Sequence, residues 1–150
     1  MLLDRQNHVA NRVALAAAAN VTTVATDVID LNAARDIGAG TGLQFYHLLH
    51  EAAPLGGTSV EFQIATSNDL TFSAGVTVVA STGAIPLASL RQGYLIFQPV
   101  PRAPGGSKYS RYVTTRLVRV GTFTGSAVWS SGIVDDATDF LQFYQARFSV

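Results

Sequence analysis

A series of short β-like runs separated by turn residues is the feature that most constrains the fold of this 150-residue chain. The clearest run spans residues 58–66, where Val60, Phe62 and Ile64 alternate with polar residues, the period-2 pattern of a strand with one buried face. Further runs lie at 24–30, 76–80, 94–97, 110–120 and 125–134, separated by Gly, Pro, Asn and Asp. Because no helix-length spacers lie between the runs, the sequence predicts an all-β, antiparallel sandwich.

Three segments carry more specific expectations. Residues 42–51 alternate like a strand but also fit one face of a helix, and the surrounding β runs favour the strand. In residues 125–134, the alternation places Ala127, Trp129 and Ile133 on one face, with Val128 and Val134 on the other. The run at 94–97 is closed by prolines at 99 and 101, which predicts an edge strand or a turn there.

The composition excludes several classes of protein. Hydrophobic residues make up 48% of the chain and charged residues 13%, about half the usual share of roughly 25%. Hydroxyl and amide side chains, or partner molecules, must therefore cover much of the surface. A net charge of zero argues against a nucleic-acid partner and favours association. The absence of cysteine excludes disulfides, thiolate catalysis and Cys-ligated zinc.

No membrane or secretion signal is predicted. The chain has no apolar run of the 18 or so residues that a membrane span requires. The first residues, Met-Leu-Leu-Asp-Arg, lack the basic start of a signal peptide.

The composition divides the chain into an N-terminal arm (1–23), a sandwich domain (24–135) and an aromatic tail (136–150). The alanine-rich stretch 13–20 predicts a short helix. The arm either packs on its own domain or reaches a neighbouring subunit. The tail carries four aromatic residues at helical spacing behind a cluster of aspartates, and it either packs on the core or presents aromatic anchors at an interface.

Residues 26–42 join the arm to the sandwich and end in three glycines spaced by two. The Gly-Ala-Gly-Thr-Gly segment at 38–42 resembles part of a phosphate-binding loop. It lacks the third glycine three residues after the second, and no lysine follows it. Residues 26–42 are therefore predicted to be a hinge that places a contact, with the glycines supplying positive φ angles.

No catalytic or metal-binding set emerges from the polar residues. His47 and His50 lie three apart, so on a strand they face opposite sides and cannot close on one metal ion. The carboxylates at 27, 30 and 36 and at 135, 136 and 139 are expected to cap and form turns. A glycosidase pair among them depends on their separation in space. We expect no enzyme activity, no cofactor and no metal.

Basic residues concentrate between 102 and 119, at Arg102, Lys108, Arg111, Arg116 and Arg119. The acidic residues concentrate elsewhere, near 27–36 and 135–139. Two such patches on one neutral molecule suit contact between subunits. Charge balance within one monomer is an equally valid interpretation.

Six segments together resemble the capsid cement (decoration) proteins of short-tailed bacteriophages. They are Met1-Leu-Leu-Asp-Arg-Gln6, Thr26-Asp-Val-Ile-Asp-Leu31, Ala34-Arg-Asp-Ile-Gly-Ala-Gly40, Ser59-Val-Glu-Phe-Gln63, Ile85-Pro-Leu-Ala-Ser-Leu90 and Pro99-Val-Pro-Arg102. The resemblance extends from residue 1 to about residue 135. It implies a jelly-roll sandwich that binds the outside of an assembled shell of major capsid protein and holds neighbouring capsomers together.

The resemblance and the residue patterns lead to one set of expectations. The protein is a virion structural protein on the capsid exterior, made in the host cytoplasm, with the major capsid protein as partner and a dimer or trimer as its own state. A carbohydrate-binding or carbohydrate-hydrolysing β-sandwich is the alternative, which a surface platform built on Trp129 or tyrosines would support; a tail or fibre module is a third. The candidate interface residues are Leu2, Leu3, Asp4, Arg5, Val13, Leu15, Asp27, Asp30, Arg35, Asp36, Phe143, Tyr144 and Phe148.

Overall fold

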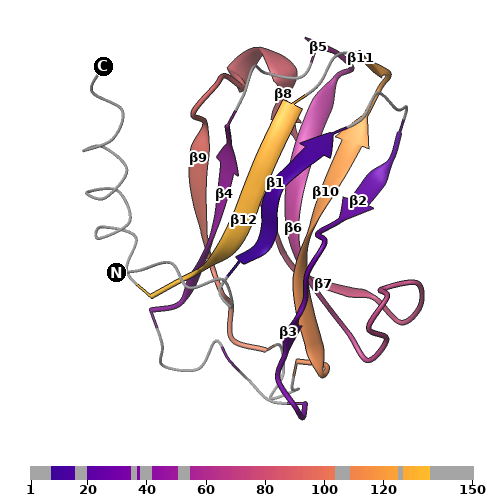
Figure 1. Ribbon diagram of the computed structural model, residues 1–150, viewed down its shortest axis with the longest axis vertical. Helices are drawn as coiled ribbons and strands as arrows, with labels where there is room; N and C mark the ends of the chain where they lie inside the picture. Colours follow the sequence, from indigo (N-terminus) through magenta and orange to yellow (C-terminus); the bar gives the residue numbers. More distant parts are fainter. Residues whose placement is uncertain are drawn as a thin grey trace.

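Two antiparallel β-sheets packed face to face form the protein in the computed structural model (Figure 1). The structure describes residues 8–15, 20–34, 37, 42–50, 55–103, 109–124 and 127–135. The prediction of an all-β antiparallel sandwich is confirmed. Among the described residues the one helix is a 3-10 turn, η2 (Leu87–Ser89), which is far too short to cross a membrane.

The first sheet contains four strands, in the order β1 (His8–Leu15), β12 (Ala127–Val134), β4 (Gln44–Leu49) and β9 (Leu95–Pro99). The second sheet has the order β2 (Thr22–Val24), β10 (Tyr112–Val120), β6 (Ser59–Ser67) and β7 (Thr77–Ser81). Two short strands join its ladders: β3 (Ile29–Asp30) pairs with β10, and β8 (Ile85–Pro86) pairs with β6. A further pair, β5 (Leu55–Gly56) and β11 (Phe123–Thr124), continues the pairing of β6 with β10.

Strands from the first half of the chain pair with strands from the second half in a nested order. β1 pairs with β12, β2 and β3 with β10, β4 with β9, and β6 with β7. The ladders between β12 and β4 and between β10 and β6 then join these pairs into two sheets. Every ladder between described strands is antiparallel.

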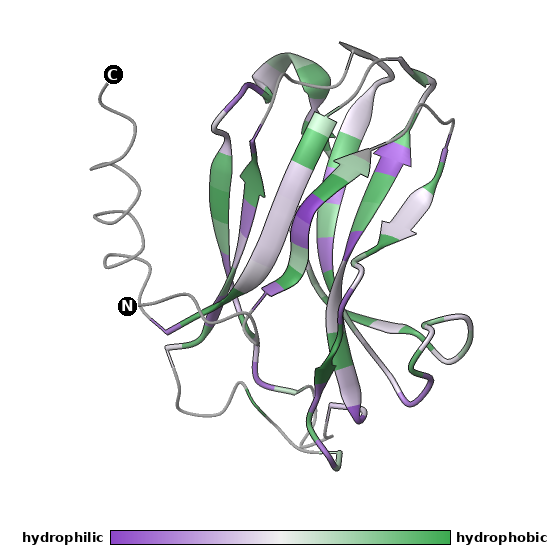
Figure 2. Ribbon diagram, in the orientation of Figure 1, coloured by the Kyte–Doolittle hydropathy of each residue, from purple (hydrophilic) through white to green (hydrophobic). Residues whose placement is uncertain are grey.

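The two sheets meet over β4, β12 and β6. The His47 ring of β4 stacks on the Phe62 ring of β6 with ring centroids 4.7 Å apart, and the Trp129 ring of β12 lies 6.1 Å from the same Phe62 ring. Val60 and Ile64 extend this core along β6. Hydrophobic and hydrophilic residues alternate along strands such as β1 and β10, as expected where only one face of a strand is buried (Figure 2).

The ambiguous segment 42–51 contains a strand, as predicted. In β4, Phe45 and Leu49 belong to the core between the sheets, whereas Tyr46 and Leu48 belong to a separate cluster. The predicted faces of β12 are also confirmed, because Ala127 and Trp129 join the core and Val134 joins the other cluster. The prediction of an edge or turn after 94–97 is confirmed, since β9 is the last strand of its sheet.

The N-terminal segment differs from the prediction. Residues 13–15, expected to begin a helix, belong to β1, which pairs with β12 from His8 opposite Gly132 to Leu15 opposite Ala127. Val9 and Ala10 are fully buried. Pairing with β12 and burial of these side chains outweigh the helix propensity of alanine, which is marginal in a segment this short. The sandwich therefore begins inside the segment assigned to an arm; residues 1–7 and 136–150 lie outside the described residues.

Candidate interaction surfaces

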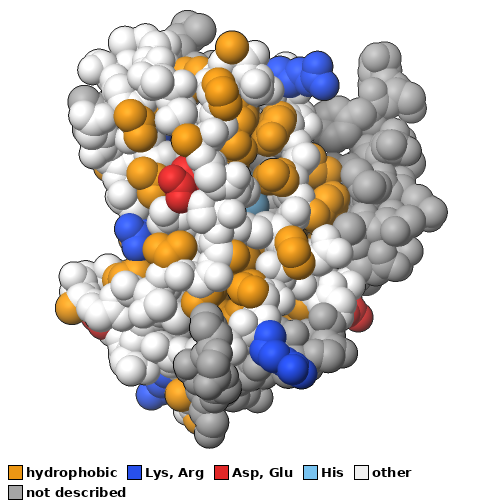
Figure 3. Space-filling model, turned by 180° about the vertical axis from the view of Figure 1, so that it is seen from behind, with side chains coloured by type: hydrophobic (Ala, Val, Ile, Leu, Met, Phe, Trp, Pro, Cys, Tyr) orange, Lys and Arg blue, Asp and Glu red, His pale blue; other side chains and the backbone are white. Residues whose placement is uncertain are grey.

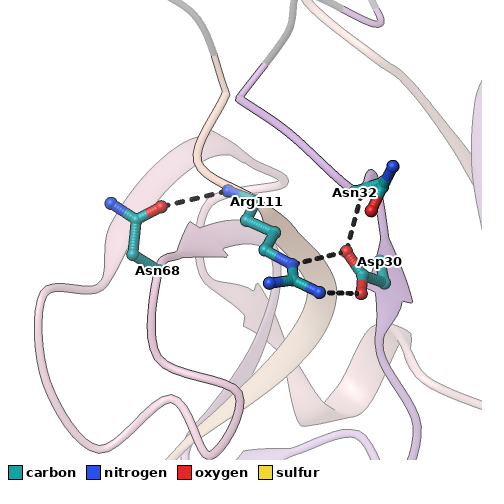
Figure 4. A network of polar contacts seen from close by, with 4 residues as sticks. All are labelled: Asp30, Asn32, Asn68 and Arg111. Atoms are coloured by element: carbon teal, nitrogen blue, oxygen red, sulfur yellow. Dashed lines mark hydrogen bonds and ion pairs between the residues drawn. The ribbon is translucent and has the colours of Figure 1, made fainter.

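Asp30 lies in an ion pair at one end of the sandwich (Figure 4). The pairing of β3 with β10 places Asp30 opposite Tyr112, next to Arg111. Arg111 Nε lies 2.9 Å from Asp30 Oδ1, and Arg111 Nη2 lies 2.8 Å from Asp30 Oδ2, so the pair is bidentate. The Asn32 backbone N–H donates to Asp30 Oδ1 at 2.7 Å, and the Arg111 backbone N–H donates to Asn68 Oδ1 at 3.2 Å.

The electrostatics of this pair follow from these hydrogen bonds. Donation from Arg111, followed by donation from Asn32, lowers the pKa of Asp30 to about 2. Both side chains remain nearly half exposed, at 46% and 43%. The pair therefore fixes the end of β3 against β10 while staying accessible, and its contribution to stability is screened by solvent.

The Asp30–Arg111 pair shows that part of the charge pattern is balanced within one chain. Asp30 belongs to the acidic stretch and Arg111 to the basic stretch, and they neutralise each other within one chain. Arg119 is likewise used internally, because its Nη2 donates to Thr23 Oγ1 at 3.1 Å and its guanidinium lies over the Phe123 ring. Charge balance within the monomer thus accounts for Arg111, and Arg119 is buried against neutral groups of the same chain, while Lys108 lies outside the described residues.

The remaining predicted interface residues are not brought together. Asp27 is exposed, and its backbone carbonyl accepts a hydrogen bond from Thr114 Oγ1 at 2.8 Å. Val13 is half-buried, packs against the core and lies opposite Trp129 in the ladder, and Leu15 lies opposite Ala127. The other predicted residues lie outside the described residues: Leu2, Leu3, Asp4, Arg5, Arg35, Asp36, Phe143, Tyr144 and Phe148.

The histidines of β4 do not converge. His47 is fully buried between the sheets, with Nε2 3.2 Å from Gln98 Oε1 and Nδ1 3.0 Å from Ser131 Oγ. Burial lowers its pKa to about 4, opposed by the hydrogen bond to Gln98, so the ring is neutral at pH 7. His50, just beyond the strand, contacts Ser130 Oγ at 2.7 Å. Within the described part of the chain, no group of three or more His, Asp or Glu side chains could hold a metal ion.

The residue expected to form the centre of a carbohydrate-binding surface, Trp129, is not on the surface. Trp129 is fully buried and packs against Phe62, so it cannot form a platform for a sugar ring. Tyr46 and Tyr109 are buried as well, and Tyr112 lies beneath the guanidinium of Arg111 at 5.0 Å. This burial counts against the carbohydrate alternative.

Hydrophobic side chains gather on the open side of the sandwich. Because β4 lies over β6, the next strands outward border one side: β9 from the first sheet, and β7 and β8 from the second. Seen from behind, the molecule shows many hydrophobic side chains across this face and only a few charged ones (Figure 3). We define the open side by the partly exposed hydrophobic residues of these strands and of the turns next to them, namely Val79, Ala80, Ile85, Leu87, Tyr94 and Ile96.

The loop between β6 and β7 is a further candidate for contact with a partner protein. The sequence patterns predicted only a turn there. The Asp69 carboxylate accepts hydrogen bonds from the backbone N–H groups of Thr71, Ser73 and Ala74 and from the hydroxyls of Thr71 and Ser73. These donors, Ser73 first, lower the pKa of Asp69. They hold a loop on which Leu70 is 56% exposed. An aspartate followed by hydroxyl residues two and four positions later was the available signal.

Comparison with known proteins identifies the family to which the chain belongs. No curated protein matches the chain significantly. The model of one protein family, described as Bbp16, matches residues 13–133, which span nearly all of the two sheets and well over half of the 150 residues. The chain therefore belongs to the Bbp16 family.

Proposed function

We propose that this protein is a capsid cement protein that binds the outer surface of a phage head and clamps neighbouring major capsid subunits. The observation that carries the proposal is the open side, where partly exposed hydrophobic residues lie between two edge strands with few charges (Figure 3). Apolar side chains gathered on one side of a molecule often mark a protein–protein interface. The resemblance of six sequence segments to cement proteins of short-tailed phages supports the same function.

The strand order supports the jelly-roll form that this function implies. A jelly roll is a long antiparallel ribbon rolled into two four-stranded sheets. The nested pairs β1–β12, β2–β10, β4–β9 and β6–β7 form such a ribbon, and each sheet receives two of them. The two strands at the open side, β7 and β9, each lie at the end of a sheet in the described part of the chain.

A clamp of this kind acts through buried area and through repetition. An extended segment of a shell subunit can join the sheet at the edge of β7, and the side chains of the open side can bury against it. Many copies bound around a symmetric shell then add modest contacts into a strong total effect. Because the protein binds the assembled shell, binding stabilises the assembly by linkage.

Co-sedimentation tests the proposal. The purified protein is mixed with empty heads assembled from the major capsid protein of the same phage, and the bound copies per capsid subunit are counted. We expect saturable binding at a fixed ratio to the capsid subunits. Ile96→Lys on the open side should reduce the bound copies about tenfold or more, because it places a charge where apolar surface must be buried.

A control variant tests whether the loss of binding depends on the position of the lysine or only on the loss of a hydrophobic side chain. Val120→Lys also removes an exposed aliphatic side chain, 46% exposed, but on β10, which lies on the other side of β6 from β7. It should bind as the unchanged protein does. Circular dichroism and thermal unfolding show whether each variant is folded, and Ile85→Lys replaces Ile96→Lys if the latter is not. Failure of the unchanged protein to bind heads would contradict the proposal, and equal binding by the two lysine variants would contradict the assigned surface.

A further inference from the structure

The loop between β6 and β7, residues 68–76, projects from the body of the sandwich (Figure 1). Its Leu70 is 56% exposed, the largest exposed fraction of any large hydrophobic residue that the structure describes. A single exposed leucine is common on protein surfaces and by itself indicates no function. The loop that carries Leu70, however, is held in one shape by its own hydrogen bonds, which sets this leucine apart.

Asp69 and Ser67 hold the loop together. The Asp69 carboxylate accepts hydrogen bonds from three backbone N–H groups of the loop, at 3.0 Å from Thr71, 2.9 Å from Ser73 and 3.2 Å from Ala74. Ser67 Oγ accepts a hydrogen bond from the Asp69 backbone N–H at 3.0 Å and donates one to the Ala74 carbonyl oxygen at 2.8 Å. The two ends of the loop are thus joined, and its shape does not depend on a partner.

Phe72 and Asn68 fix the loop to the rest of the fold. Phe72 is only 7% exposed and has a φ of 54°, a left-handed conformation that residues other than glycine rarely adopt. Strained positions of this kind are concentrated at functional sites. Asn68 Oδ1 accepts a hydrogen bond from the Arg111 backbone N–H at 3.2 Å, which ties the start of the loop to the residue before β10. The fold therefore holds an ordered loop that leaves more than half of Leu70 in water.

The chain that follows Asp69 is uncharged. No Asp, Glu, Lys or Arg occurs from Leu70 to Leu90, and Val78 on β7 is also exposed, at 43%. The carboxylate of Asp69 itself is occupied by the donors of its own loop. A charged partner surface would lose hydration here without gaining an ion pair, whereas an apolar pocket gains by burying the leucine. The chemistry therefore favours an apolar pocket as the partner of Leu70.

We propose that Leu70 is a preorganised anchor that inserts into an apolar pocket of a major capsid subunit. The inference rests on the proposed function and adds to it a contact separate from the residues of the open side. The loop leads directly into β7, the strand that borders the open side, so it continues that surface beyond the sandwich. Because the loop is already ordered, little conformational entropy is lost on binding, and the burial of Leu70 contributes almost fully to affinity.

Co-sedimentation with empty heads measures the contribution of Leu70. Leu70→Ser removes the proposed anchor from an exposed position, so the protein should stay folded, and the apparent dissociation constant for heads should rise about tenfold or more. Val120→Ser removes a comparably exposed aliphatic side chain, 46% exposed, from β10 and should change that constant by less than about twofold. Circular dichroism and thermal unfolding check each variant, and Leu70→Gln replaces Leu70→Ser if the latter is unfolded.

A second variant tests whether the order of the loop matters. In the free protein, Asp69→Ala should speed amide hydrogen exchange at Thr71, Ser73 and Ala74 about tenfold or more, because their acceptor is gone. Asp69→Ala should also weaken binding to heads although Leu70 is still present. Added to Asp69→Ala, Leu70→Ser should then raise the dissociation constant by less than about threefold, since the leucine is no longer presented in a fixed position.

The outcomes separate this inference from the proposed function. If the unchanged protein binds heads and Leu70→Ser binds equally well, the anchor is overturned while the proposed function stands. If the unchanged protein does not bind heads, both are overturned. Sedimentation velocity of the free protein covers the remaining occupant: if Leu70→Ser dissociates an oligomer of the chain but still binds heads normally, the pocket belongs to a second copy and the inference is wrong.

Discussion

At the scale of single residues, the polar side chains in the core serve the fold. His47 lies between the sheets, stacks on Phe62 and has a partner for each ring nitrogen, Gln98 on one side and Ser131 on the other. A neutral ring can occupy this site at little cost, whereas a charged ring pays the full penalty of burial. His47 therefore links the stability of the sandwich to pH.

The first prediction concerns this linkage. The pKa of His47 is about 4 in the folded protein and about 6.5 in the unfolded chain. Between these values the unfolded chain binds a proton that the folded protein does not. The free energy of unfolding should therefore fall by about 3 kcal/mol as the pH drops from about 6.5 to about 4. Above this range, His47 contributes no pH dependence.

Urea unfolding at several pH values measures this dependence. His47→Gln replaces the titrating ring by an amide that can still form hydrogen bonds. The variant should be less stable at pH 7, and its stability should change less between pH 6.5 and 4. His8, whose pKa is also lowered by burial, stays in both proteins, so the difference between the two curves isolates His47. Parallel curves would show that His47 is not the group responsible.

At the scale of elements, β1 is the strand that the local sequence predicts least well. It is an edge strand of the first sheet, and its ladder with β12 is interrupted by register shifts, with Arg12 at a φ of 51°. The Arg12 backbone N–H donates to Ser130 Oγ at 2.9 Å, which ties this irregular point to β12. Irregular edges of this kind discourage pairing with another chain. Removal of residues 1–20 would take away β1 and leave β12 as a bare edge.

The second prediction tests the place of β1 in the fold. Val9 is fully buried, so Val9→Ala should lower the free energy of unfolding by about 2 kcal/mol through lost burial and a residual cavity. Asn11→Ala, an exposed position on the same strand, should change it by less than about 0.5 kcal/mol. Urea unfolding at pH 7 compares the two variants. Similar small effects at both positions would mean that β1 detaches in solution and acts as an arm after all.

At the scale of the whole molecule, the surface is poor in charge and the net charge is zero. The Asp30–Arg111 pair and the burial of Arg119 use charged groups inside the monomer. Because only 13% of the residues are charged and they sum to zero, the chain offers little long-range attraction, so the proposed contact with a shell depends on buried apolar area.

The third prediction follows from this balance. Binding of the protein to empty heads should change less than about threefold between roughly 0.05 and 0.5 M NaCl, because salt screens exposed charges but does not weaken apolar burial. Co-sedimentation across a salt series measures the effect. A loss of about a hundredfold or more would instead assign the contact to exposed basic groups such as Arg102, and Arg102→Gln would then reproduce the loss at low salt.

The periodicity of the sequence by itself determined the β-sandwich and the faces of its strands. The alternation in β4, β6 and β12 predicts which side chains point inward, because side-chain direction along a strand depends only on neighbouring residues. The same alternation separates His47 from Tyr46. The zero net charge and the lack of cysteine also needed no structure to interpret.

Only the tertiary structure decided which strands pair and which charges meet. Asp30 and Arg111 are 81 positions apart, and the chain between them carries no local signal for their ion pair. The alanine-rich N-terminal stretch favours a helix by local propensity, yet its first residues form β1 because β12 offers a ladder and a core to cover. Pairing energies between distant segments exceed local preferences of a few tenths of a kcal/mol per residue, and they exist only once the chain has folded.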